Sequence, residues 1–311
     1  MAASLASYLV GGFFTFVGIM GVVLNSTVLL AIYKGRLLSS KTSPVYILSS
    51  QTLAVDTLLV LIHLVYHAPA VALQRDITPP EFDFIFEFIL MYGWFHNSLS
   101  HILIALNRLV VIVFKRSDVF TRNRTIALSL LHHFIAAALS IATEFMLPCC
   151  KLSFSWPSYS YAYAELPGVI NYSAILTIPV EIASSLISII SYAVVMLEPS
   201  SSRRVAMQLD NDKKRRHQEY RYAIQFAVMA LVYSLAWILF NTFPIIIGKT
   251  SVLYVYGVVT VLVLINTLAN ATVYLTNNKE IQNSIRVMLG RSTNVHSITD
   301  VVTHSSKTEH A

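Results

Sequence analysis

The residue with the strongest chemical demand in this sequence is Asp56, a carboxylate inside the apolar stretch 45–73. In hydrocarbon, an ionised carboxylate needs a partner, a cation or a proton to offset the cost of its burial. Amide side chains in other apolar stretches can supply donors or oxygens, and the candidates are Asn25, Asn97, Asn266 and Asn270. These residues predict a buried polar core, with simple helix-to-helix hydrogen bonding as the alternative for any single amide.

Helical spacing gathers these polar residues on shared faces. One stripe consists of Trp94, Asn97, His101, Ile104 and Arg108. A second stripe consists of Asn266, Asn270, Tyr274 and Asn277. Residues three, four and seven positions apart lie on one side of an α-helix. The two stripes are therefore expected to meet inside a helix bundle, together with Asp56.

A second candidate site lies toward the other end of the same stretches. Its members are Glu87, Leu90, Met91, Trp94, Glu181, Ile245 and Thr260. We expect them to line an outer cavity for a small-molecule ligand, in which Glu87 or Glu181 could pair with an amine. The alternative for either glutamate is internal hydrogen bonding or burial in the protonated form.

Metal and disulfide chemistry find little support in the sequence. The candidate histidines are His63, His67, His96 and His101. No two of them share a ligand-like pair with a carboxylate, so neither a metal nor a cofactor is expected. Cys149 and Cys150 are neighbours, and disulfide geometry does not favour a bond between neighbours. They are interpreted as packing residues, with free thiols or partners for another chain as alternatives.

Seven long apolar stretches must position these residues. They span about 8–33, 45–73, 86–114, 126–148, 168–197, 222–247 and 252–276. Each reaches the ~20 residues that a helix needs to cross a bilayer. Only 12% of the residues are charged, against about 25% in soluble proteins. The sequence therefore predicts an all-α integral membrane protein, a seven-transmembrane helix bundle.

A single domain, 1–290, is expected to hold the seven spans, followed by a disordered cytoplasmic tail, 291–311. Apolar residues at helical spacing between Asn278 and Leu289 predict a short amphipathic helix along the membrane after the seventh span. Residues 1–7 carry no charge and no cleavable-signal layout, so the first span is expected to act as an uncleaved signal anchor.

Charge predicts the orientation in the membrane. Of the 22 Lys and Arg residues, three lie in the second, fourth and sixth loops, and eighteen lie in the other loops and the tail. The remaining one is Arg108, near the end of the third span. Basic loops stay in the cytoplasm, so the amino terminus is expected outside and the carboxyl terminus inside. These inner loops account for the net charge of +6 without a nucleic-acid partner.

Four motifs in order resemble the rhodopsin-like family of G-protein-coupled receptors. They are Asn25, Leu53-Ala54-Val55-Asp56, Asn107-Arg108 and Asn270-Ala271-Thr272-Val273-Tyr274, the last similar to NPxxY with Ala271 in place of proline. The run Leu147-Pro148-Cys149-Cys150, followed by aromatic residues, makes the chain most similar to the nematode serpentine chemoreceptors of class X. The resemblance covers about 8–290 and implies the rhodopsin-like fold.

The resemblance implies a chemosensory receptor of the plasma membrane, including that of a sensory cilium. Such a receptor binds an unknown small molecule from outside and signals through a heterotrimeric G protein. The implied coupling residues are Asn107, Arg108 and Tyr274. The implied cation site consists of Asp56, Asn97, Asn266 and Asn270, whose oxygens suit a hard ion. Because Asn107 is neutral, it cannot hold Arg108 by charge, so a looser resting state is expected. Arg108 could alternatively be only a positively charged anchor.

The chain also departs from the family pattern. No cysteine opens the third span, so the family's disulfide to the second outer loop cannot form with that partner. Leu109 stands where tyrosine is usual, and Trp237 and Pro244 are seven residues apart where the family has Trp-x-Pro. These differences bear on stability and on signalling competence.

Two other classes of protein remain as alternatives. A seven-span transporter or channel would show charged pairs, broken helices and internal repeats, and only Pro179 and Glu181 hint at these. A membrane enzyme would need clustered histidines and acidic residues near one leaflet, and His132-His133 alone does not supply them. The sequence therefore favours a receptor over both.

Overall fold

Long helices account for most of the structure, a computed structural model that describes residues 4–39, 42–116, 118–164, 168–197, 210–247 and 253–291. The helices are α1 (Leu5–Lys34), α2 (Val45–Ile62), α3 (Ala68–Leu73), α4 (Pro80–Ile112), α5 (Arg122–Ile141), α6 (Tyr172–Leu197), α8 (Asp210–Ile247), α9 (Gly257–Asn277) and α10 (Lys279–Met288). Two π-helical turns, η1 (His63–His67) and η2 (Ala142–Met146), and two 3₁₀ turns, η3 (Trp156–Ser158) and η4 (Leu253–Tyr256), join them. The strands are β1 (Leu152–Ser155) and β2 (Ser160–Tyr163).

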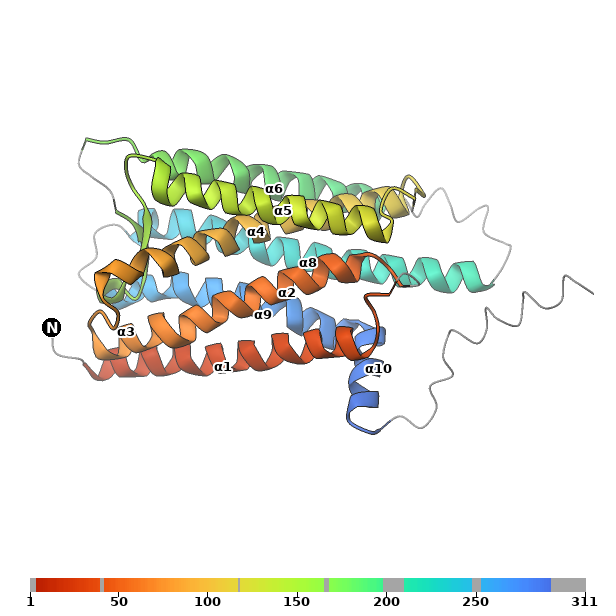
Figure 1. The fold of residues 1–311 in the computed structure, drawn as a ribbon, viewed down its shortest axis with the longest axis horizontal. Coiled ribbons are helices and arrows are strands. Elements are labelled where there is room, and N and C mark those ends of the chain that lie inside the picture. Colours follow the sequence, from red (N-terminus) through yellow and green to blue (C-terminus); the bar gives the residue numbers. More distant parts are fainter. Residues whose placement is uncertain are drawn as a thin grey trace, which may run out of the picture.

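The seven predicted spans are confirmed. Seven helices in the described part of the chain are long and apolar enough to cross a membrane. They lie side by side in one elongated bundle, and α10 turns away across one end (Figure 1). The helix of the sixth span begins earlier than predicted, because α8 starts at Asp210, within the stretch 198–221 that was expected to be a loop, whereas the candidate span itself covers Tyr220–Thr242. Of the predicted tail, 291–311, residues 292–311 lie outside the described residues.

Helix α4 lies at the centre of the bundle. It contacts α2, α5, α6 and α8, so residues on several of its faces are buried. Close approach to α2 depends on Gly93: a Cβ there would lie 2.5 Å from a methyl carbon of Leu59. Because residues three or four positions apart share a helix face, this approach also brings Asp56 and Asn97 together.

Prolines explain both π-helical turns. Pro69 and Pro148 have no N–H to donate, and in a regular α-helix their rings would clash with the carbonyl four residues earlier. Before each proline the hydrogen bonding shifts by one residue: the amide of Ala68 donates to the carbonyl of His63, and that of Leu147 donates to Ala142. At η1 the widened turn lies between α2 and α3, and His63 and His67 are both buried there.

A β-hairpin covers one end of the bundle, where only an aromatic-rich loop was expected. Strands β1 and β2 pair antiparallel, with Leu152 opposite Tyr163. The Thr260 hydroxyl on α9 donates to the carbonyl of Tyr159 at the hairpin turn, at 2.8 Å. The indole N–H of Trp156 donates to Asp76 at 2.8 Å. The hairpin is thus attached to α9 and to the loop after α3.

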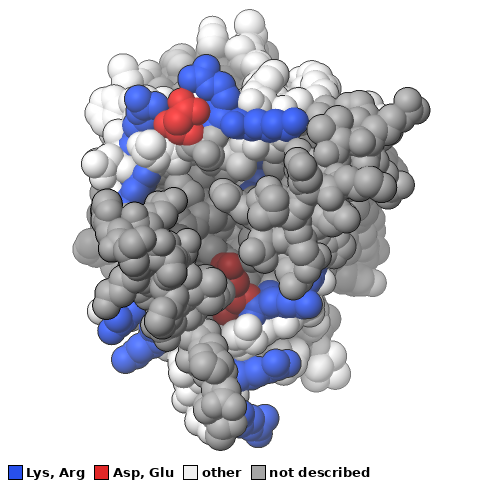
Figure 2. All heavy atoms as spheres, turned by 90° about the vertical axis from the view of Figure 1, so that its right-hand side faces the viewer, with Lys and Arg blue, Asp and Glu red and all other residues white. Residues whose placement is uncertain are grey.

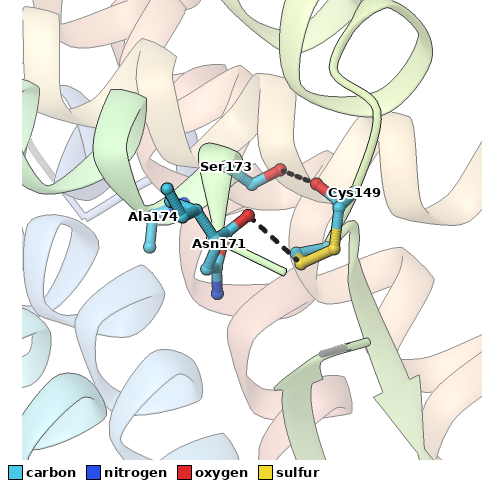
Figure 3. The surroundings of a disulfide bond; sticks show 6 residues. Cys149, Asn171, Ser173 and Ala174 are labelled. Atoms are coloured by element: carbon cyan, nitrogen blue, oxygen red, sulfur yellow. Dashed lines mark hydrogen bonds between the residues drawn. A yellow bond between two sulfur atoms is a disulfide. The ribbon is translucent and has the colours of Figure 1, made fainter. Parts of the chain in front are cut away.

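Cys149 and Cys150 form a disulfide with each other, so the expectation that neighbouring cysteines would not bond is wrong (Figure 3). Cys150 adopts a positive φ of 77°, a conformation that non-glycine residues rarely adopt. Ser173 at the start of α6 donates its hydroxyl to the carbonyl of Cys149, at 3.5 Å. The disulfide therefore lies where the fourth span, the hairpin and the fifth span meet.

The short helix after the seventh span is confirmed. Asn278 caps it, because its side-chain oxygen accepts the backbone N–H of Ile281 at 3.1 Å. Ile281 is fully buried against the bundle, whereas Arg286 in the last turn is exposed. The helix α10 therefore has the apolar face and the polar face that an interfacial helix needs.

Basic side chains gather at one end of the bundle (Figure 2). Exposed members at this end include Lys34, Arg36, Lys115, Arg116, Arg122, Arg124, Lys279, Arg286 and Arg291. The hairpin end carries Arg75 and Lys151 in the described part of the chain. We call these two ends the basic end and the hairpin end.

Candidate functional site

The polar core predicted around Asp56 is present in part. The Asp56 side chain is fully buried. One of its oxygens accepts the side-chain amide of Asn97 on α4 at 2.9 Å, and the other accepts that of Asn270 on α9 at 2.6 Å. Three helices that are far apart in sequence thus converge on one carboxylate.

Two of the predicted core residues, Asn25 and Asn266, give Asp56 no hydrogen bond. The Asn25 amide donates to the carbonyl of Thr267 at 3.4 Å, which links α1 to α9. Asn266 is 9% exposed and gives Asp56 no hydrogen bond. The side-chain oxygens of Asn25 and Asn97 are buried and have no hydrogen-bond partner among the described residues. Unsatisfied acceptors beside a carboxylate are the feature of this core that a cation would suit.

At the basic end, Arg108 lies against two aromatic rings. Its side chain is 1% exposed, and its guanidinium carbon is 5.5 Å from the ring centre of Tyr222 and 5.1 Å from that of Phe226, both on α8. Both distances fit cation–π attraction. We call Tyr222 and Phe226 the Arg108 cage. Neither residue was among those predicted from the sequence, although two aromatic residues four positions apart near the start of the sixth span were a usable signal.

The other two predicted coupling residues are also buried at this end. Asn107 is 2% exposed and Tyr274 is 2% exposed. The Tyr274 hydroxyl donates to Ser49 on α2, and its ring packs edge-on against Phe226 with centres 6.1 Å apart. Because Asn107 is neutral, it supplies no charge to hold Arg108, and a looser resting state was expected for that reason. That expectation did not include the attraction between Arg108 and its cage.

A hydrogen-bond cluster ties the cage to α2 and α10. The hydroxyl of Tyr46 on α2 lies 3.2 Å from that of Tyr222. Tyr46 also donates to the carboxylate of Glu280 and accepts the side-chain amide of Asn278 at 3.1 Å. A movement of α8 at this end would therefore disturb both the cage and α10.

At the hairpin end, a small cavity lies between the helices and the hairpin. It is lined by Leu90, Met91, Trp94, Leu152, Tyr161, Tyr163, Thr177, Phe240 and Val263. Its free space is about 10 Å³, roughly the space that one water needs. Leu90, Met91 and Trp94 were predicted to line it. The hairpin residues were not, because their positions depend on a pairing that the sequence pattern did not indicate.

The other predicted cavity residues lie elsewhere. Glu181 is fully buried, and its oxygens accept hydrogen bonds from Ser98 and, at 2.5 Å, from the Tyr233 hydroxyl. Thr260 faces the hairpin turn. Glu87 is partly exposed and is not part of the cavity lining. The side chain of Ile245 lies outside the described residues.

Tyr161 joins the hairpin to the turn η1. The hydroxyl of Tyr161 bonds to His63 and lies 2.9 Å from Nδ1 of His67. The Nδ1 of His63 lies 2.7 Å from the carbonyl of Leu59, so this nitrogen carries the proton and the other accepts from Tyr161. The two histidines therefore act as hydrogen-bond partners that hold one wall of the cavity.

Comparison with known proteins gives a family and a fold. Residues 15–286 match the family described as "Serpentine type 7TM GPCR chemoreceptor Srx". Comparison with curated proteins gave no significant match. Among solved structures, the crystal structure of squid rhodopsin superposes with a TM-score of 0.74 over 92% of this chain and 85% of that chain, at 14% sequence identity. At that identity the likeness shows the fold, a rhodopsin-like bundle.

Proposed function

Since this chain belongs to the Srx family of serpentine seven-transmembrane G-protein-coupled chemoreceptors, we propose that it binds a small molecule in the hairpin-end cavity and activates a heterotrimeric G protein at the basic end. One observation carries the proposal: α4 and α8 each contribute to both places. Trp94 on α4 and Phe240 on α8 line the cavity, whereas Arg108 and its cage join the same two helices at the other end.

The proposed mechanism follows from the fact that α4 and α8 contribute to both sites. The cavity has little free space, so a ligand must push its walls apart to enter. Moving Phe240 relative to Trp94 changes the packing of α8 on α4, and the Arg108 cage joins the same two helices at the basic end. A ligand that prefers the separated arrangement shifts a two-state bundle toward an opened basic end.

The cavity lining also indicates the class of ligand. Leucine, methionine, valine and aromatic side chains predominate, and Thr177 and the tyrosines supply hydroxyl groups. No charged side chain lines the cavity in the described part of the chain, and Glu181 is engaged by Ser98 and Tyr233. We therefore infer a small, uncharged, largely apolar ligand in preference to an amine.

We propose that the basic end faces the cytoplasm, with the amino terminus outside, in the plasma membrane and in a sensory cilium where one is present. The charge asymmetry between the two ends supports this orientation. In intact cells, a protease is expected to cleave a tag at the amino terminus and to spare a tag at the carboxyl terminus until the cells are permeabilised. Cleavage of the carboxyl-terminal tag in intact cells contradicts the orientation.

The cavity is tested by filling it. A Val263→Phe change adds a ring to a nearly full cavity, and overpacking costs about 1–3 kcal/mol. We expect the concentration of an uncharged activating compound that gives half-maximal response in a G-protein reporter to rise by about tenfold or more. Val258→Phe is the matched control, because Val258 lies on the same helix with its side chain 44% exposed toward lipid. An unchanged response of Val263→Phe removes this cavity as the binding site.

The transporter or channel alternative is tested in the same cells. Compounds that activate the reporter are applied while ion current across the plasma membrane is recorded. Reporter activation without current supports the receptor. Current that persists when G proteins are inactivated favours the transporter or channel instead.

A further inference from the structure

A groove between α8 and α9 near the basic end is not used by either proposed site. It is lined by Arg221, Ile224, Gln225, Val228, Val273 and Asn277. Its free volume is about 150 Å³, several times the space that one water needs. Ile224 and Val228 are 47% and 44% exposed, so the groove opens on the outer surface of the bundle, where lipid chains would lie.

The groove contains a buried polar side chain, that of Gln225. Its side chain is 3% exposed, and neither its nitrogen nor its oxygen has a hydrogen-bond partner among the described residues. A buried polar group without a partner destabilises the fold, so an amide in this position needs both an acceptor and a donor. A molecule that enters the groove can supply both.

Arg221 adds a positive charge at the same place. It lies one helical turn before Gln225, on the same face of α8. Its guanidinium donates to the backbone carbonyl of Asn277 at 2.6 Å, which holds it across the groove toward α9. A guanidinium has five N–H donors, so others remain for an anion.

Three features thus occur in sequence along one groove: a cation, a buried amide and exposed apolar side chains. A phospholipid has the same order of chemistry, from a charged headgroup through ester and hydroxyl groups to a hydrocarbon chain. We propose that the groove binds one anionic phospholipid of the cytoplasmic leaflet, with a headgroup that carries donors as well as a phosphate, as phosphatidylserine does.

In this arrangement the phosphate contacts Arg221, and the Gln225 amide exchanges hydrogen bonds with the headgroup or the glycerol esters. One acyl chain covers Ile224, Val228 and Val273. The assignment to the cytoplasmic leaflet rests on the proposed orientation. The binding itself needs neither the proposed ligand nor a G protein, so it is measured independently of both.

The test uses the full-length receptor, purified in detergent and stripped of bound lipid. Phosphatidylserine is added at increasing concentration, and the occupied fraction is read by native mass spectrometry. Phosphatidylcholine tests the need for net negative charge, and soluble glycerophosphoserine tests whether the headgroup suffices without chains. We expect saturable binding of one phosphatidylserine, and at least about fivefold weaker binding of phosphatidylcholine.

Two variants locate the binding. Arg221→Gln removes the cation, and we expect about fivefold weaker phosphatidylserine binding. Arg286→Gln is the matched control, since it removes a basic residue from the same end of the bundle, outside the groove. An equal loss in both variants would mean that general attraction to the basic end explains the binding, and the groove would be rejected.

Gln225→Met keeps the volume and removes both unmet polar atoms. We expect lipid binding to weaken by about tenfold, because two hydrogen bonds are lost, while the lipid-free receptor keeps or raises its melting temperature. If Gln225 serves only to stabilise the helices, the variant melts lower without lipid and binds phosphatidylserine as the wild type does. That result, or binding of glycerophosphoserine as tight as that of the lipid, overturns the proposal.

Discussion

Asp56→Leu is expected to lower the thermal stability of the receptor more than any other single substitution in the bundle interior. Leucine has the branched shape of aspartate, with bulkier methyl groups in place of the oxygens, and offers no acceptor, so the amides of Asn97 and Asn270 lose their partner in a fully buried site. Each stranded donor costs about 1–3 kcal/mol, or roughly 2–6 kcal/mol together. We expect the melting temperature of the purified receptor to fall by more than about 5 °C and surface expression to fall with it.

Asp56→Asn is the control for this result. Asparagine keeps one acceptor for Asn270, and its new amide can donate to the Asn97 oxygen, which has no partner among the described residues. A single rotation of the Asn97 amide then satisfies the pair, so this variant is expected to melt within about 2 °C of the wild type. Equal destabilisation by both substitutions would mean that charge, and not the supply of hydrogen-bond acceptors, holds the core together.

The same pair of variants tests the proposed cation site. A bound sodium favours one bundle state, so ligand affinity of the wild type should change with sodium at constant ionic strength, and Asp56→Asn should abolish that dependence. The competing account is that Asp56 is protonated and the two amides satisfy it. If the ligand affinity of the wild type does not change with sodium, the core is held by hydrogen bonds alone and the proposal of a cation site is wrong.

The Tyr222→Leu/Phe226→Leu receptor is expected to signal without ligand. Both rings face the Arg108 guanidinium at cation–π distance, and each contact is worth about 0.5–2 kcal/mol. Their loss removes roughly 1–4 kcal/mol that joins α4 to α8 at the basic end. We expect basal G-protein activation in a reporter assay to rise about fivefold or more, normalised to receptor at the cell surface.

Conservative variants separate the rings from their other contacts. Tyr222→Phe keeps the ring but removes the hydroxyl that lies 3.2 Å from Tyr46, and Phe226→Tyr keeps a ring face for Arg108. Both should retain low basal activity if the cation–π contacts hold the resting state. Raised activity in Tyr222→Phe alone would instead assign that role to the Tyr46 cluster.

Arg108→Ala distinguishes two effects, the loss of the cation–π contacts that hold the resting state and the loss of the proposed contact with the G protein. Alanine keeps the helix-forming tendency of α4 but removes the cation that the G protein is proposed to contact. We expect normal surface expression and reduced ligand-driven activation, in contrast to the high basal activity of the cage variant. If Arg108→Ala couples as the wild type does, this residue has no coupling role and is only a charged anchor.

The sequence by itself determined the seven membrane-spanning helices of this protein. In a bilayer the backbone must satisfy its own hydrogen bonds, so long apolar stretches can only be helices, and their number and order are readable from hydropathy. Periodicity then placed Asn97 and Arg108 on one face of α4 and Asn270 and Tyr274 on one face of α9. The convergence of Asn97 and Asn270 on Asp56 was accordingly predictable, and the structure contains it.

Tertiary structure decided which of the candidate residues meet. The rotation and tilt of each helix come from packing against its neighbours, and they bring Asn270 to Asp56 but leave Asn266 apart. The same packing directs Glu181 toward Tyr233, to which it is hydrogen-bonded, and away from the cavity. It also places Arg108 against Tyr222 and Phe226. A periodic pattern identifies the buried face of one helix, but only a second helix determines what that face contacts.

The hairpin and the disulfide, which lie in a loop, were likewise not predictable from the sequence pattern. Strands of four residues have no periodicity long enough to recognise, and their pairing depends on residues that come together only when the chain turns at Trp156–Ser158. The positive φ of Cys150, which accompanies its bond to Cys149, is likewise a backbone conformation that composition does not reveal. Side-chain spacing therefore determined the helices and their buried faces, whereas long-range contacts determined the hairpin-end cavity, the Arg108 cage and the groove beside Gln225.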